Sequence, residues 1–153
     1  MRRFATALAG AACLLAVVTA TAPTASAHHA FAAEFDANAP VLLRGKVVRI
    51  EWINPHAWVH VQTEEKGRTQ VWAVEGGTPN TLLRGGITRE TLKIGTEIVG
   101  RGYQSKDPSC TPTCKANGRD MTLPNGQKAF FGSSGTGAPR DGADPTEPPT
   151  PKP

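Results

Sequence analysis

The chain has 153 residues and a formal net charge of +4, but a folded core must form from fewer residues. Residues 1–27 have the layout of a removable export signal. From about Gly132 the chain is rich in Gly and Pro and holds six of the 13 prolines. Roughly 104 residues, 28–131, remain for one small domain. This length excludes α/β barrels and two-domain dinucleotide-binding enzymes.

The first 27 residues predict secretion. Arg2 and Arg3 precede an apolar run from Phe4 to about Val18, and residues 25–27 are small, as a signal peptidase requires. We expect cleavage after Ala27 and a periplasmic or secreted protein. An uncleaved anchor or another cleavage site is the alternative. The apolar run is short for a membrane span, and no second apolar stretch of that length follows, so the processed chain is not expected to cross a membrane.

The charge of the processed chain is nearly balanced. Removing Arg2 and Arg3 lowers the 17 Lys and Arg residues to 15, against 13 Asp and Glu, which is a net charge of +2. Both signs are interspersed along the chain, without a block of like charges. This pattern lacks the basic footprint of a nucleic-acid-binding protein, so we expect no nucleic-acid partner.

The first strong element runs from Val41 to Ile53. Its apolar alternation changes parity near Val48, which predicts a long strand with a bulge. Asn54-Pro55 marks a turn. Residues 56–63 fit a helix with Asn54 as N-cap, but their β-branched side chains favour a strand.

A third strand is predicted from Thr69 to Glu75, followed by a short helix with Thr78 as N-cap and Pro79 in its first turn. Further strands follow at 97–103, 119–123 and 128–131, the last two forming a closing hairpin. The chain is therefore mainly β, and the order predicts an OB-like barrel of five or six strands with one short helix after the third. Such a fold does not by itself indicate a function. Residues 132–153 are predicted to be a disordered tail.

Two cysteines, Cys110 and Cys114, remain after processing. In an oxidising compartment they predict a disulfide that closes a very short loop. A metal or redox pair is the alternative, although the spacing is not C-x-x-C and no histidine is near in sequence.

Several local strings together resemble a known family. They are residues 28–36 with the His28-His29 start, 45–48, 52–58 with the Asn54-Pro55-His56 turn, 72–77 and 82–86. The chain resembles a family of small exported bacterial proteins known as domain of unknown function 6152, over nearly all of residues 28–131. The resemblance implies export and a small β-rich domain, and it implies no activity.

All four histidines, His28, His29, His56 and His60, fall in the first third of the processed chain. Cleavage after Ala27 would make His28 the N-terminus, so that its α-amine and ring Nδ1 could chelate one metal ion. A nitrogen-rich tetragonal site suits Cu(II) or Ni(II), and copper is the cofactor we consider. This arrangement is similar to the N-terminal histidine sites of exported copper carriers and copper oxygenases.

The other three histidines have different expected roles in such a metal site. His29 can add an imidazole or a backbone nitrogen, and His56 is the natural donor from the barrel. His60 lies four residues further, about 13 Å along a strand, which is too far to share one ion with His56 on that strand. In the alternative interpretation, the terminal histidines are solvated and the ring of His56 orients a turn through a hydrogen bond.

Three tryptophans, Trp52, Trp58 and Trp72, are placed on neighbouring strands. They are candidates for a stacking face toward a flat ligand, although packing in the core is the alternative. Glu51 and Glu75 are the carboxylates nearest to them. The favoured function is a non-enzymatic periplasmic binding protein that holds a copper-class metal ion.

The first alternative function is an envelope module that binds a small organic ligand, a saccharide or a protein through its tryptophans. A third possible function is that of a metal-dependent oxidoreductase, which would need an open coordination position and a substrate groove.

Overall fold

The computed structural model describes residues 28–132, and it describes side chains from Phe31 onward. The predicted export signal at residues 1–27 and the predicted tail beyond Gly132 lie outside the described residues. Within them, no helix has the length and apolar character needed to cross a membrane.

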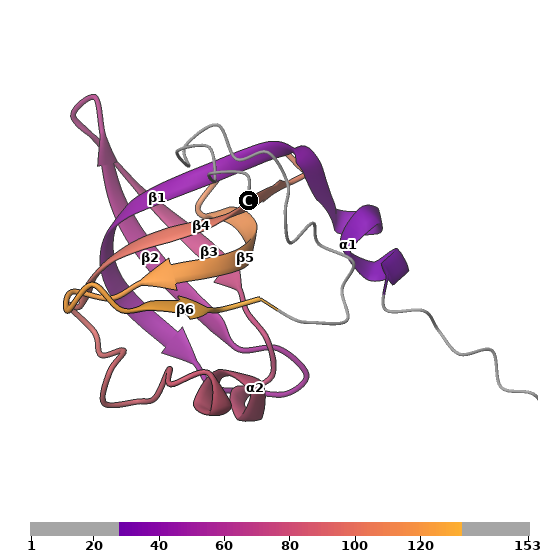
Figure 1. Cartoon of the computed structure of the whole chain (residues 1–153). Coiled ribbons are helices and arrows are strands. Elements are labelled where there is room, and N and C mark those ends of the chain that lie inside the picture. The colour runs from indigo at the N-terminus through magenta and orange to yellow at the C-terminus, as the bar shows by residue number, and fades with distance from the viewer. Residues whose placement is uncertain (1–27, 133–153) are drawn as a thin grey trace, which may run out of the picture.

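Six strands and two short helices make up the described chain (Figure 1). In chain order they are α1 (His28–Glu34), β1 (Phe35–Glu51), β2 (Trp58–Glu65), β3 (Arg68–Glu75), α2 (Pro79–Arg84), β4 (Glu97–Ser105), β5 (Cys114–Thr122) and β6 (Lys128–Phe130). The predicted mainly β class is confirmed.

Five strands close into a ring. β1 pairs antiparallel with both β2 and β4, while β2 pairs with β3 and β4 with β5. The ring is closed by parallel pairing of β3 with β5, and β6 adds to the outer edge of β5. Strand order and the helix after β3 match the predicted OB-like barrel.

The long first strand has the predicted irregularity. Its register against β2 shifts between Val47 and Arg49, next to Val48. The bulge lets β1 bend and serve two neighbours in the barrel. Residues 58–65 form a strand, which decides the helix-or-strand alternative left open by the sequence.

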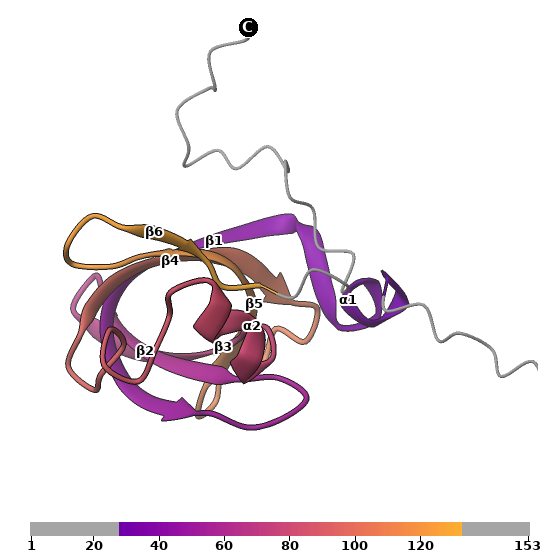
Figure 2. The same cartoon turned by 60° about the horizontal axis from the view of Figure 1, so that its bottom comes forward.

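Helix α2 forms as its sequence predicts. The Thr78 hydroxyl oxygen accepts a hydrogen bond from the backbone N–H of Thr81 at 3.2 Å, and Pro79 begins the helix. Leu82 projects from α2 into the interior with no exposed surface. Figure 2 shows α2 lying across one end of the barrel. The helix therefore covers that end of the barrel.

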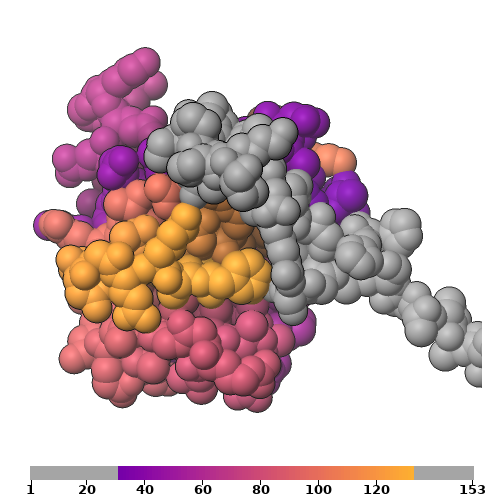
Figure 3. All heavy atoms as spheres, in the orientation of Figure 1, coloured from indigo at the N-terminus to yellow at the C-terminus, as the bar shows by residue number. Residues whose placement is uncertain are grey.

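The core is apolar and continuous. It is formed by side chains from the five barrel strands, from the turn before β2, from α2 and the turns after it, and from the closing hairpin: Leu43, Val47, Ala57, Val59, Val61, Val74, Leu82, Ile87, Leu92, Ile98, Met121, Leu123, Ala129 and Phe131. The hairpin of β5 and β6 lies at the molecular surface (Figure 3).

Two elements differ from the sequence predictions. Helix α1 was not predicted, so the molecule has two short helices rather than one. It docks through a second small cluster in which Phe31 and Phe35 pack on Tyr103, with the rings of Phe31 and Tyr103 edge to face at 5.5 Å. Strand β5 begins at Cys114, five residues before the predicted start at Arg119.

Candidate functional site

The turn between β1 and β2 is held against the segment between β3 and α2. The N–H of Ala57 donates to the carbonyl of Gly77 at 3.0 Å, and the N–H of Gly76 donates to the carbonyl of Ala57 at 2.8 Å. These two bonds join Ala57, at the end of the turn, to the two glycines that follow β3. They bring His56 next to Glu75, at the end of β3.

The ring of His56 has a defined orientation. Its Nδ1 lies 3.1 Å from the carbonyl oxygen of Gly76 and 3.3 Å from Oε1 of Glu75. Because a carbonyl oxygen only accepts hydrogen bonds, Nδ1 carries a proton in this geometry. In the neutral ring the lone pair is then on Nε2, to which no described residue donates or accepts. His56 therefore presents one free ligand nitrogen, and the side chain is 31% exposed.

Glu75 is the buried partner in this pair. Its side chain is only 10% exposed, and burial raises the pKa of its carboxyl group, with His56 and Lys115 opposing the rise and Glu34 adding to it. In the parallel register Glu75 lies opposite Asn117 of β5. The side-chain oxygen of Asn117 is buried and has no hydrogen-bond partner among the described residues.

Helix α1 ends close to the same place. Glu34 acts on Glu75 electrostatically and lies 3.8 Å from Lys115. The carbonyl of Glu34 also accepts hydrogen bonds from the N–H of Lys106 at 2.8 Å and from the hydroxyl of Ser105 at 3.3 Å. The C-terminal end of α1 is thus fixed near the His56–Glu75 pair.

The N-terminal end of α1 holds the two predicted terminal ligands. His28 and His29 begin the helix, but their side chains lie outside what the structure describes. The seven residues of α1 span about 10 Å. The backbone of His28 is therefore about one short helix length from Glu34.

His60 belongs to a separate pair. Its Nε2 lies 2.8 Å from Oε1 of Glu51, and Nη2 of Arg49 lies 3.3 Å from the same oxygen. The structure thus ties His56 and His60 to different glutamates. Across residues 28–132, no group of three or more His, Cys, Asp or Glu side chains is arranged to hold a metal ion.

The three tryptophans do not share one face. Trp52 and Trp72 pack against the core, and Trp72 lies opposite buried Val61 in the β2–β3 register. Trp58 alternates with buried Val59 and Val61 along β2, and it therefore points to the outer face. Trp52 also has the guanidinium of Arg89 over its ring, 5.3 Å from the centroid. The geometry does not assemble the predicted three-tryptophan stacking face.

Glu51 and Glu75 do flank an aromatic residue. In the two registers Trp58 lies between them, opposite Glu51 of β1 and Glu75 of β3. Each carboxylate is engaged by a histidine rather than left open toward a cleft. The sequence indicated that these two glutamates lie near the tryptophans. It did not indicate that Glu51 contacts His60 and that Glu75 contacts His56.

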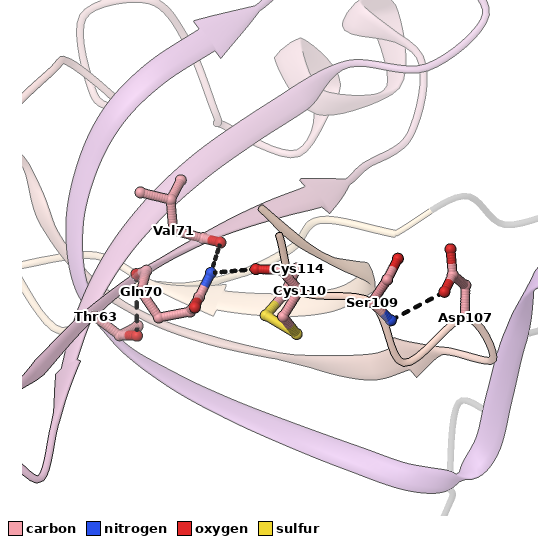
Figure 4. Close-up of a disulfide and its surroundings, with 7 residues drawn as sticks. All are labelled: Thr63, Gln70, Val71, Asp107, Ser109, Cys110 and Cys114. Carbon is pink, nitrogen blue, oxygen red and sulfur yellow. Dashed lines mark hydrogen bonds between the residues drawn. A yellow bond between two sulfur atoms is a disulfide. The ribbon is translucent and has the colours of Figure 1, made fainter. Parts of the chain in front are cut away.

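The predicted disulfide is present. Cys110 and Cys114 are joined, with their Cα atoms 4.0 Å apart, and Cys114 is the first residue of β5 (Figure 4). The side-chain amide of Gln70 donates to the Cys110 carbonyl at 3.4 Å and to that of Val71 at 3.0 Å. The link fixes the loop before β5 beside β3, where the parallel seam closes the barrel.

An open groove of about 660 Å³ lies elsewhere on the barrel. Charged and polar side chains from β1, β2 and β4 line it, together with Leu123 and Pro124. None of the histidines, tryptophans or cysteines named above contributes to its lining. The groove is therefore not part of the His56 site.

A family model described as a family of unknown function, DUF6152, matches residues 15–114. The chain belongs to this family. The match includes His56, Glu75 and both cysteines, and it ends where β5 begins. No curated protein and no solved structure matches the chain.

Proposed function

We propose that this chain is a non-enzymatic binding protein, periplasmic or secreted, that holds a copper-class divalent metal ion at a processed N-terminal His28. The α-amine and ring Nδ1 of His28 would supply two nitrogens, and Nε2 of His56 would supply a third. His29 can add a fourth nitrogen. Such a nitrogen-rich set suits tetragonal Cu(II).

The observation that supports the proposal most is the hydrogen bonding of His56. Histidines that bind metals commonly donate their other ring N–H to a carboxylate or a backbone carbonyl, which fixes the tautomer and the ring orientation. Nδ1 of His56 has both kinds of acceptor, Gly76 O at 3.1 Å and Glu75 Oε1 at 3.3 Å. The same bond also orients the turn, as the alternative interpretation expected, so the two roles are compatible.

His60 provides a matched comparison. It also has a carboxylate partner, but the β1–β2 register places it opposite Arg49, whose guanidinium shares the same Glu51 oxygen. The adjacent cation disfavours binding of a divalent ion there. We therefore assign the barrel ligand to His56 alone.

The test is a competition titration of Cu(II) with a chain that begins at His28. His56→Gln should lower the affinity at least tenfold, about 1.4 kcal/mol. His60→Gln should leave it within twofold. Equal losses in the two variants, or none in His56→Gln, would remove His56 from the site. The packing of Trp52 and Trp72 in the core leaves no observation that favours the tryptophan-face alternative.

A further inference from the structure

The open groove away from the His56 site is lined by charges on the outer face of the barrel. Arg44 of β1 follows the buried Leu43, and Glu64 of β2 follows the buried Thr63, so both charged side chains lie on the outer face. Both residues are exposed and both line the groove. Its volume of about 660 Å³ falls within the range of roughly 300–1,000 Å³ that is usual for small-ligand pockets. The groove is therefore large enough for a small organic ligand.

The strand pairing keeps these two opposite charges apart. The β1–β2 ladder ends at the pair of Gly45 with Thr63, and Arg44 and Glu64 are the next residue on each strand. From there β2 continues into its hairpin with β3, which projects from the barrel (Figure 1). Within residues 28–132, neither Arg44 nor Glu64 has an ion-pair or hydrogen-bond partner for its side chain. The groove therefore has an unpaired cation and an unpaired anion.

The other two charges of the groove neutralise each other. Nζ of Lys46 lies 3.5 Å from Oε1 of Glu97, on the neighbouring strand β4. Both side chains are well exposed, at 64% and 74%. Arg44 and Glu64 are thus the two charges of the groove that a ligand can pair with, and Lys46 and Glu97 serve as an internal comparison.

Apolar surface begins directly beside the guanidinium. Arg44 lies opposite Val99 of β4, and Val99 lies opposite Thr122 of β5. The next two residues of the chain, Leu123 and Pro124, line the same groove. A ligand that matches the whole groove therefore carries a negative group, a positive group and an apolar side chain.

We propose that this groove binds an amino acid or a short peptide with free termini, in its zwitterionic form. The ligand carboxylate pairs with the guanidinium of Arg44, whose planar fork of donors suits a carboxylate. The ligand ammonium group donates to the carboxylate of Glu64, and the apolar side chain packs on Val99 and Leu123. A simple anion is repelled by Glu64 and a simple cation by Arg44, so the two charges together select a zwitterion. This inference does not depend on the proposed metal site.

The test titrates the ¹⁵N-labelled chain from His28 to Pro153 with leucyl-leucine at constant ionic strength. A pH of about 6.5 keeps the α-amine of the dipeptide charged. The backbone amide resonances of Arg44, Glu64 and Val99 should shift and saturate. N-acetyl-leucyl-leucine lacks the ammonium group and leucyl-leucinamide lacks the carboxylate, so each should bind about fivefold more weakly.

L-leucine distinguishes the two sources of the zwitterion, because it carries the same two charges on a single residue. Binding as tight as that of leucyl-leucine would assign the groove to free amino acids. Weaker binding would assign it to peptides.

Two double variants with unchanged net charge provide the matched control. Arg44→Gln with Glu64→Gln should make the free dipeptide and its two blocked forms bind equally weakly. Lys46→Gln with Glu97→Gln removes the paired charges and should keep every affinity within about twofold. Since all four side chains are exposed, the barrel should fold in both variants.

The single variants assign each charge to its partner. Arg44→Gln should remove only the preference for a free carboxylate, and Glu64→Gln only the preference for a free ammonium group. The proposal would be overturned by the absence of saturable shifts at millimolar leucyl-leucine, by equal affinities of the free and blocked dipeptides, or by equal losses in the two double variants.

Discussion

Nδ1 of His56 lies 3.3 Å from Oε1 of Glu75, a carboxylate whose side chain is only 10% exposed. The pair joins the turn before β2 to the end of β3, and Glu34 of α1 acts on the same carboxylate. Three segments distant in sequence thus come together around the Glu75 carboxylate. The orientation of the His56 imidazole, and with it the position of Nε2, depends on the contact with this carboxylate.

The first prediction concerns the pH dependence of stability. Burial raises the pKa of Glu75 in the folded state above its ordinary value of 4.5. The folded chain therefore binds a proton more readily than the unfolded chain, and the contribution of Glu75 to stability falls as pH rises from about 4.5 through the raised value. Glu75→Gln mimics the protonated form at every pH.

We expect Glu75→Gln and wild type to have similar free energies of unfolding in urea at low pH. The variant should become the more stable of the two as pH rises to neutrality. A difference between the two proteins that stays constant from pH 4 to pH 8 would show that Glu75 titrates normally.

The second prediction concerns the packing of Phe131 under the His56 turn. A Cβ at Gly76 would lie 2.6 Å from Cζ of Phe131, whose ring is buried. Gly76→Ala should therefore lower the free energy of unfolding by about 1–3 kcal/mol, the usual cost of overpacking. A Cβ at Gly100 would meet only Leu43, at 4.0 Å, so Gly100→Ala is the control and should be nearly neutral. Equal effects in chemical denaturation would contradict the packing argument.

The third prediction concerns the disulfide. Cys110 and Cys114 close a loop of about five residues, so replacing both by serine should cost about 2 kcal/mol in unfolding free energy. Since Cys114 lies opposite Trp72 in the parallel seam, the seam should also open locally more easily, in addition to this global loss. Hydrogen exchange should accelerate most at the β3–β5 pairs, from Trp72 to Glu75. Uniform acceleration across all strands would show that the bond acts on global stability only.

The fourth prediction concerns the docking of α1. Phe31 is buried against Phe35 and Tyr103, so Phe31→Ala should cost roughly 3 kcal/mol or release α1 from the barrel. Either result should also weaken Cu(II) binding, because His28 would lose its position relative to His56. Phe130→Ala is the control, since Phe130 is 40% exposed. Unchanged Cu(II) affinity in Phe31→Ala would separate α1 from the metal site.

Much of the fold follows from local sequence rules. The parity change near Val48 marks the bulge in β1, and Thr78 with Pro79 marks the start of α2. The early part of β5 does not follow such rules, because Asn117, Gly118 and Asp120 disfavour strands and show no alternation. Pairing with β3 on one side and β4 on the other overrides that preference.

The site is harder to predict from the sequence than the fold is. His56 was a candidate because of its place at the turn, but its partner Glu75 lies 19 residues away and is brought near by the backbone bonds of Ala57 and Gly76. Whether Trp72 shares a face with Trp58 depends on the register of β2 against β3, which the alternation within each strand does not fix.

The central proposal depends on one peptide bond, that between Ala27 and His28. The most direct measurement compares two purified chains by Cu(II) competition titration, one beginning at His28 and one with a single alanine added before it. The proposal predicts at least a tenfold lower affinity for the extended chain, because the added residue removes the six-membered chelate of amine and Nδ1. Equal affinities of the two chains would contradict the N-terminal metal site.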